Sequence, residues 1–167
     1  DVSFRPIAAK FGPDGALYIA DWSNPIIQHG EVDFRDPRRD HERGRIWRIV
    51  AKNRPLEKKP KLVRANNSEL LDQLLSPNAF NREQANRLLT ERGEKIQKDL
   101  AKWTAKQSTE KSKLEALWMY QAIDVVEPNL LETCLKASDG RVRAAAVRVF
   151  SAWQNRLPDV SNALAKL

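Results

Sequence analysis

The feature that most constrains the fold is a pattern that recurs three times in the second part of the chain. A basic residue stands three positions before an alanine, and a pair of large residues follows three and four positions after it. The three copies begin at Arg82, Lys113 and Arg143, which are 31 and 30 positions apart. Such a period is typical of helix pairs that bury a shared face by stacking on their neighbours. The pattern predicts a mainly α fold of about three helix pairs, an α-solenoid.

Apolar spacing and capping residues place the individual helices. The first is predicted to begin at a cap on Asn67 or Ser68, and Gly93 stands where a left-handed C-cap is favoured. The predicted helices cover 69–75, 78–92, 94–106, 110–126, 128–137 and 141–156, and Pro158 is predicted to open a further one.

The tryptophans and the single cysteine of the helical part are predicted to be packing residues. Trp103, Trp118 and Trp153 lie at helical spacing with other apolar residues, which favours packing over a stacking platform. Cys134 lies in an apolar helical pattern and is predicted to be a small core residue. One cysteine excludes an internal disulfide and a cysteine-rich zinc site.

Residues 1–56 have the period of strands rather than helices. Pro13-Asp14-Gly15 is a turn signal, because Pro fixes φ, Asp bonds the local backbone and Gly accepts positive φ. Alternating residues predict three strands, over 7–11, 17–22 and 45–50. Three strands make a weak unit, so this sheet is expected to need a packing partner.

A basic linker, residues 57–66, is predicted to join the β segment to the helical residues 67–167. Residues 35–64 carry 12 lysines and arginines against 4 acids, whereas residues 67–167 carry 15 against 13. A nucleic-acid-binding array should carry its basic residues along the helices, so this distribution counts against nucleic acid as a partner. The apolar runs are too short to span a membrane. Because the chain begins with Asp1, we expect it to be a piece of a larger protein.

The segment between the second and third predicted strands is the candidate for chemistry. It holds both histidines, His29 and His41, together with Asp33, Asp36 and Asp40. These residues could hold a metal, but they lack the fixed spacing of known metal motifs, and no metal site is predicted. Alternatively, Asp36, Arg39, Asp40 and Arg45 form an ion-pair and turn network that only closes the sheet.

Two longer runs resemble a known family. Phe11-Gly12-Pro13-Asp14-Gly15-Ala16-Leu17-Tyr18-Ile19-Ala20-Asp21-Trp22 resembles one blade of the six-bladed propellers of glucose and sorbosone dehydrogenase-like proteins. Arg35-Asp36-Pro37, Arg39-Asp40-His41 and Gly44-Arg45-Ile46-Trp47-Arg48 resemble the last blade of planctomycete-type membrane-bound dehydrogenases. In that family HEAT-like repeats follow the propeller, often with a cytochrome c domain. The pattern of residues 67–167 is similar to HEAT-like repeats of the phycobilisome-lyase type, but the sequence has no Cys-x-x-Cys-His motif.

The resemblance implies a parent protein of the quinoprotein sugar or alcohol dehydrogenase type, located in the periplasm or otherwise outside the cytoplasm. Such enzymes bind pyrroloquinoline quinone (PQQ) and calcium through loops at the propeller mouth, with a histidine as base. By resemblance, His41 is the candidate catalytic residue, and the candidate cofactor-binding residues are Arg38, Arg39, Asp40 and Arg43. One loop does not make a site, so this chain alone is expected to be inactive and to hold no cofactor.

The expected function is therefore that of a non-catalytic interaction or scaffold module. Its expected partners are a neighbouring propeller domain or another protein, with a cytochrome c domain in the parent. The main alternative is a nucleic-acid-binding HEAT-like domain, like the DNA glycosylases built from such repeats. A third reading, from the repeat type alone, is a lyase-like protein that handles a chromophore.

Overall fold

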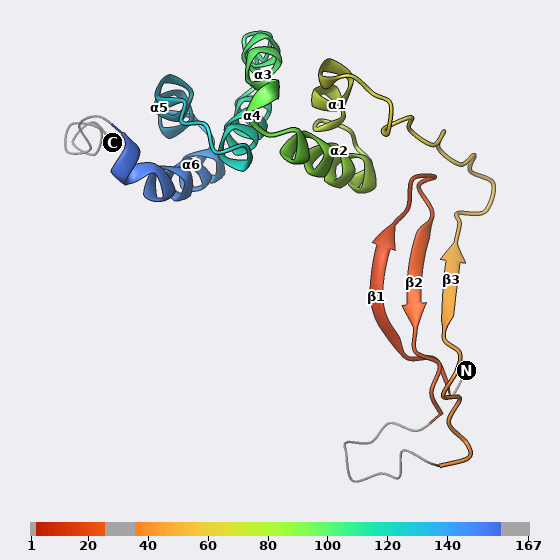
Figure 1. Ribbon diagram of the computed structural model, residues 1–167. Helices are drawn as coiled ribbons and strands as arrows, with labels where there is room; N and C mark the ends of the chain where they lie inside the picture. The colour runs from red at the N-terminus through yellow and green to blue at the C-terminus, as the bar shows by residue number, and fades with distance from the viewer. Residues whose placement is uncertain (1–2, 26–35, 158–167) are drawn as a thin grey trace. The chain divides into compact units, whose positions relative to one another are not determined.

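The computed structural model describes residues 3–25 and 36–157. It divides the chain into two compact units: Asp1–Pro60 with Asn78–Phe80, and Lys61–Pro77 with Asn81–Leu167. The first unit contains a three-stranded antiparallel sheet, and helices make up most of the second (Figure 1). The predicted mainly α fold with a small antiparallel β segment is confirmed at this level.

The sheet has the order β1-β2-β3, and each strand is antiparallel to its neighbour. Its strands are β1, Pro6–Phe11, β2, Leu17–Asp21, and β3, Arg45–Ile49. The bounds differ from the predicted ones by one residue at one end of each strand. The predicted alternation therefore located all three.

The turn between β1 and β2 forms as its sequence predicts. Gly15 has a φ of 76°, and its amide donates to the carbonyl of Gly12 at 3.1 Å. The Asp14 carboxylate accepts a hydrogen bond from the amide of Ala16 at 3.2 Å. A residue with a Cβ would be strained at position 15, because few L residues adopt this conformation.

The register of the sheet places apolar side chains on both of its faces. Opposite partners share a face, so one face carries the rows Ala9, Ile19, Trp47 and Phe11, Leu17, Ile49. The other face carries the rows Ala8, Ala20, Ile46 and Lys10, Tyr18, Arg48. Phe11 is 56% exposed, Ile49 51% and Ile46 76%. Among the described residues, the sheet thus leaves apolar side chains exposed on both of its faces.

Six α-helices lie in the described residues. They are α1, Asn67–Gln73; α2, Ala79–Arg92; α3, Gln97–Thr104; α4, Glu110–Ala122; α5, Pro128–Leu135; and α6, Gly140–Trp153. Two short 3₁₀ segments accompany them, η1, Gly93–Ile96, and η2, Gln154–Arg156. The single helix predicted over 94–106 is therefore η1 followed by α3. The helix predicted from Pro158 lies outside the described residues.

The first cap was predicted one or two residues too late. Asn66 caps α1: its side chain accepts from the amide of Glu69, and the Glu69 carboxylate accepts from the amide of Asn66. This reciprocal pair is a capping box. The helix begins at Asn67 rather than 69 because Asn66 already satisfies the amide at its third position.

The second helix of each pair begins in a similar way. The side chains of Asn78, Thr109 and Asp139 accept hydrogen bonds from the first turns of α2, α4 and α6. Gly93, after α2, has a φ of 62°, and Asp124, after α4, has a φ of 59°. The left-handed cap predicted at Gly93 is confirmed, and it recurs 31 positions later (93 to 124).

The two arginines of the repeated pattern donate hydrogen bonds to the turn before their own helix. Arg82 donates to the carbonyls of Ser76 and Pro77 at 2.7 and 2.9 Å. Arg143 donates to the carbonyls of Ala137 and Ser138 at 2.8 and 2.9 Å. These carbonyls lie six and five positions before each arginine, so the same contact is made twice.

The core of the helical unit follows the repeat. Three alanines, one in each second helix, are fully buried: Ala85, Ala116 and Ala146. Three leucines at matching places in the first helices are also buried: Leu70, Leu100 and Leu130. Helix α3 packs against α1 and α4, and α4 packs against both α5 and α6. Small and large side chains thus alternate between the helices, which allows close packing between them.

The tryptophan prediction is right for two residues and wrong for one. Trp103 and Trp153 are buried, and so is Cys134, as predicted. Trp118 is 40% exposed, so it is not a core residue. Its repeat equivalents are Arg87 and Arg148, and the position therefore faces outward.

Candidate functional site

A buried carboxylate at the end of β2 connects three separate segments of the sheet unit. Asp21 is 2% exposed, and its Oδ1 accepts from the amides of Arg5 at 2.7 Å and Ser23 at 2.8 Å. Its Oδ2 accepts from the indole Nε1 of Trp47 at 2.8 Å. Burial raises the pKa of Asp21, but these hydrogen bonds outweigh it and leave the pKa below its ordinary value. The carboxylate is therefore an ionised structural group.

A second carboxylate closes the other end of the sheet. Arg48 of β3 donates to Asp14 Oδ2 from Nε at 3.0 Å and from Nη2 at 2.6 Å. The hydroxyl of Tyr18 donates to the same oxygen at 3.2 Å. The hydrogen bond from Arg48 lowers the pKa of Asp14. Asp14 and Asp21 therefore bind the sheet together internally.

Sequence reasoning missed the hydrogen bonds that Asp14 and Asp21 accept from distant segments. It assigned Asp14 to the local turn and treated Asp21 only as a strand residue. The available signal for Asp21 was an acid at the end of an apolar strand, where a carboxylate can be buried only if it is hydrogen-bonded.

Beside Asp21, the side chains of Phe4, Ile19, Trp47 and Ile49 line an apolar hollow of about 350 Å³. The rings of Phe4 and Trp47 meet edge to face, with centroids 6.3 Å apart.

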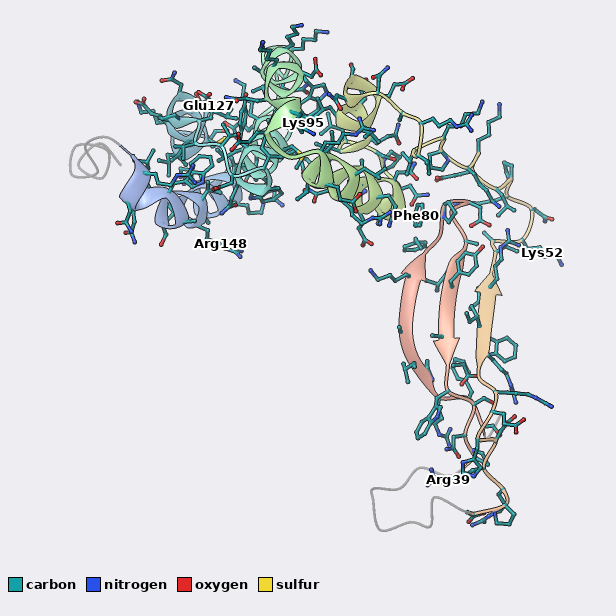
Figure 2. The ribbon with its side chains drawn as sticks, viewed as in Figure 1. Arg39, Lys52, Phe80, Lys95, Glu127 and Arg148 are labelled. Carbon is teal, nitrogen blue, oxygen red and sulfur yellow. The ribbon has the colours of Figure 1, made fainter. Side chains whose placement is uncertain are left out.

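The residues predicted from resemblance lie together in one loop. Pro37 to Arg43 line a shallow hollow of about 490 Å³, and Arg39 is labelled at this end of the sheet in Figure 2. The guanidinium of Arg38 donates two hydrogen bonds to the Asp36 carboxylate, from Nε at 3.0 Å and from Nη2 at 2.7 Å. These hydrogen bonds lower the pKa of Asp36 to about 2. The loop thus contains a local ion pair beside the candidate residues.

The remaining candidates also bind mainly to their own loop. Asp40 accepts from the amides of Glu42 and Arg43 at 3.1 Å each. The amide of Arg39 donates to the carbonyl of Asp36 at 3.0 Å, and the Arg39 side chain is buried. His41 and Arg43 are exposed. The loop brings His41 near four predicted cofactor-binding residues, but two of these, Arg38 and Asp40, already have partners within the loop.

These residues do not by themselves fit PQQ or calcium. Quinone carboxylates suit open guanidinium forks, and calcium prefers a cluster of several oxygens. Arg38 presents its fork to Asp36, and no group of three or more metal-ligating side chains occurs in the part of the chain that the structure describes. His29 and Asp33 lie outside that part. No catalytic step through PQQ or calcium follows from the residues of this loop.

The alternative network over Asp36, Arg39, Asp40 and Arg45 gains a member that was not predicted, because Asp36 also pairs with Arg38. The guanidinium carbon of Arg45 lies 5.9 Å from the ring centroid of Trp47, a cation–π distance. The contacts of Asp36 and Asp40 are those of turns, because each carboxylate bonds backbone two or three positions ahead.

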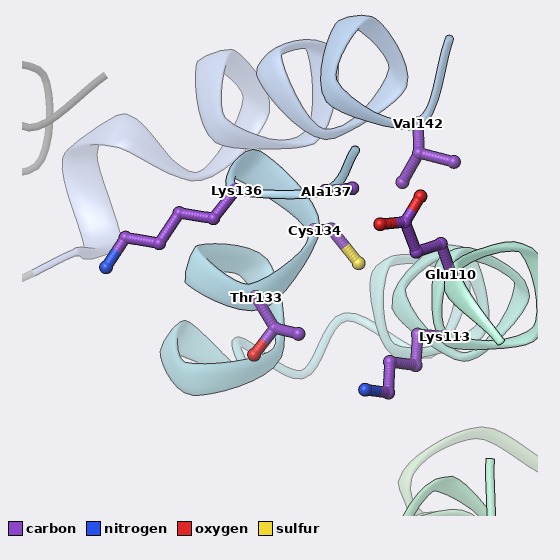
Figure 3. A pocket seen from close by; sticks show the side chains of 7 residues that line it. All are labelled: Glu110, Lys113, Thr133, Cys134, Lys136, Ala137 and Val142. Carbon is purple, nitrogen blue, oxygen red and sulfur yellow. The ribbon is translucent and has the colours of Figure 1, made fainter. Parts of the chain in front are cut away.

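The helical unit has its own pocket, between α4, α5 and α6 (Figure 3). It measures about 380 Å³ and includes Glu110, Lys113, Cys134 and Lys136. Glu110 accepts from the amides of Ser138 at 2.6 Å and Asp139 at 3.0 Å. Burial raises the pKa of the Cys134 thiol to about 11. A thiol is a nucleophile only as thiolate, so Cys134 is a packing residue. Glu110 connects α4 to the turn before α6 through its two hydrogen bonds.

Comparison with known proteins adds one finding. Residues 1–53 match a family described as Domain of unknown function (DUF7133). No curated protein and no solved structure matches the chain. Among the described residues, no helix is long and apolar enough to cross a bilayer. The matched range covers the sheet and ends before the first helix.

Proposed function

We propose that this chain is a non-catalytic interaction and scaffold module of a larger dehydrogenase-like protein. Its sheet is one propeller-like blade, and its helices are HEAT-like repeats. The observation that carries the proposal is the sheet with apolar side chains exposed on both faces. A blade inside a propeller is covered on both faces by its neighbours, whereas an independent sheet has no use for two such faces.

The blade is the docking element. Its internal bonds at Asp14 and Asp21 fix the strands, and the apolar rows around Trp47 and Ile46 are left for contact with neighbouring blades. The family match covers residues 1–53 and stops before the helices. This supports the proposal that the sheet is a unit of its own, separate from the helices. In the parent, the blade would complete a propeller of the glucose and sorbosone dehydrogenase-like type.

The helical unit is the scaffold. The recurring caps, left-handed residues and arginine contacts favour HEAT-like repeats, since each pair repeats the same geometry on the next. Such an array would hold the parent's propeller beside an electron acceptor, with a cytochrome c domain as one candidate. PQQ, calcium and the role of His41 belong to the same proposal, as does a location outside the cytoplasm.

Hydrogen exchange compared between this chain and the longer gene product tests the proposal. In the longer protein, the β1 and β3 amides and the Trp47 indole should become at least about tenfold more protected, because neighbouring blades cover them. Amides of α4 serve as the control and should exchange equally in both. Equal exchange of the sheet in both proteins would remove the blade role.

The catalytic part has a separate test in the longer protein. With added PQQ and calcium, dye reduction by sugars or alcohols should fall by at least about a hundredfold in His41→Ala, with His29→Ala as a second histidine variant. Activity that is retained in His41→Ala would remove the catalytic assignment of this residue. Sheet protection without any dye reduction would leave a propeller that acts only as a scaffold.

The nucleic-acid alternative would have to use a segment outside the helices. Four cations of the first unit are exposed along a segment without secondary structure: Lys52, Arg54, Lys58 and Lys59. A duplex that binds there should dissociate steeply as salt rises. Absence of duplex binding at low salt would exclude this function, whereas the scaffold proposal predicts that absence.

A further inference from the structure

The exposed tryptophan of α4 belongs to a row that the repeat creates. Two positions after each buried alanine stand Arg87 on α2, Trp118 on α4 and Arg148 on α6. All three are exposed. Because they occupy equivalent positions of the repeat, we expect these side chains to lie on one outward face of the helical unit.

Neighbouring helices carry this row. Helix α6 packs against α4, and the charge of Arg82 on α2 acts on Glu115 of α4. Figure 1 shows α2, α4 and α6 following one another along one side of the unit, and in Figure 2 Arg148 projects away from the other helices. Packed helix axes are about 8–10 Å apart, so Trp118 and Arg148, on the packed helices α4 and α6, are expected to be about 10 Å apart, and the repeat predicts a similar spacing toward Arg87.

The charge around Trp118 favours an acidic partner. Arg148 makes no ion pair with the residues that the structure describes, and Arg87 has only an exposed contact with Glu91 at 3.5 Å. Lys111 lies exposed two turns before Trp118. Glu115, the acid one turn away, is half-buried, and burial raises its pKa. Ala122 and Ala144 are small and exposed, so a partner's backbone can approach the indole.

We propose that this row docks an extended acidic peptide. An apolar side chain would lie on Trp118, and an acidic side chain would pair with each of Arg87 and Arg148. An extended chain rises about 3.3 Å per residue, so three residues cover the distance between neighbouring helices. The preferred pattern is acid-x-x-apolar-x-x-acid. Tryptophan and arginine are the side chains most enriched at binding hot spots.

The inference deepens the proposed scaffold role and rests on the repeat arrangement of α2, α4 and α6. It concerns a face of the helical unit, whereas the scaffold proposal is tested on the sheet. Peptide binding is measured with this chain alone and needs no propeller. A failure of one proposal is therefore distinguishable from a failure of the other.

Fluorescence anisotropy with the complete chain and a labelled seven-residue peptide tests the inference. The peptide has glutamate at both ends, leucine at the centre and serine spacers. Trp118→Ala should weaken binding by about tenfold or more, and Arg148→Glu by a similar factor. Two control variants should bind as the original chain does: Trp22→Ala, an exposed tryptophan of the sheet unit, and Arg64→Glu, at an exposed arginine outside the row, which changes the net charge equally.

Two further peptides test the geometry. Replacing both glutamates by lysine should abolish binding, and shortening each spacer by one serine should weaken it by about tenfold. The proposal would be overturned if these two peptides bound as tightly as the original peptide, or if Trp118→Ala left the affinity unchanged. An equal loss of affinity in Arg64→Glu would also overturn it. Binding of an oligothymidylate in preference to the peptide, lost in Trp118→Ala, would overturn it in favour of a nucleic-acid platform.

Discussion

The sheet unit and the helical unit reach their folds by opposite means. In the sheet, buried aspartates bond strands and loops together while large apolar side chains such as Ile46 and Ile49 stay exposed. In the helical unit, leucines and alanines such as Leu100 and Ala116 are fully buried. The helices therefore bury their own core, whereas the sheet keeps apolar surface for something else.

This difference indicates which interactions stabilise each unit. Burial of apolar area is the dominant favourable term in folding, and the helical unit uses it internally. The sheet depends more on directional hydrogen bonds to charged groups, which fix its geometry and each contribute more net stability than hydrogen bonds between neutral groups. A substitution that tests apolar burial should therefore act strongly in the helices and weakly in the sheet.

The largest expected effect is that of truncating a buried leucine in the helices. Leu100→Ala should lower the free energy of unfolding of the helical unit by about 2–5 kcal/mol, because it leaves a cavity. Urea unfolding followed by far-UV circular dichroism measures it. Leu75→Ala, at a 43% exposed leucine outside the α-helices, is the matched control and should cost less than about 1 kcal/mol.

A similar truncation in the sheet tests this contrast between the two units. Ile49→Ala should change the stability of the sheet unit by about 0.5 kcal/mol or less, followed by tryptophan fluorescence. A loss as large as that of Leu100→Ala would mean that the apolar face is already covered within this chain. The contrast between the two units would then fail.

The repeat and the turns were readable from the sequence because each has a local cause. The alanine spacing located the buried Ala85, Ala116 and Ala146, and Pro13-Asp14-Gly15 located the first hairpin. Helix ends were less accurate. Asn66 rather than Asn67 is the cap, because the choice depends on which side chain reaches the amide of Glu69.

The errors have a common origin in assigning side chains by type. Trp118 was predicted to be buried because it is large and apolar, although Arg87 and Arg148 at equivalent positions indicate an outward face. Asp21 was overlooked because acids are seldom buried. Its three donors come from residues 5, 23 and 47, and no local pattern brings these together. The candidate loop was located by charge, but its bonds depend on the folded turn.

An intermediate effect is expected from changing the buried carboxylate of the sheet. Asp21→Asn can keep an acceptor for the amides of Arg5 and Ser23, but its amide group would face the Trp47 indole, so two donors would meet. We expect amides of β2 to exchange about tenfold faster and Trp47 emission to shift to the red. Asp36→Asn, in the loop, is the control and should leave β2 unchanged. Exchange within about twofold of the original chain would show that other contacts hold the strands.

The smallest expected effect is a pH dependence of the helical unit. Hydrogen bonds from the backbone of Asp139 and Ser138 hold the pKa of Glu110 below its ordinary value of 4.5. Pairing with Arg141 lowers the pKa of Asp139 from 3.8 to about 2. A carboxyl whose pKa is lowered on folding stabilises the fold at pH above its unfolded pKa, and that contribution is lost as the pH falls through the folded pKa. The urea midpoint of the helices should therefore fall as the pH decreases from about 4.5 to about 2.

The variant Glu110→Gln assigns that loss to the junction between α4 and the turn before α6. It should lower the urea midpoint at neutral pH, because a neutral amide accepts more weakly from the amides of Ser138 and Asp139. It should also flatten the decline in acid, since one of the two titrating carboxyls is gone. Glu91→Gln, which removes only an exposed contact with Arg87, should keep the original decline. If Glu110→Gln declined as steeply as the original chain, the acid sensitivity would lie elsewhere. The ion pair of Asp139 with Arg141 would then be the remaining cause of that sensitivity.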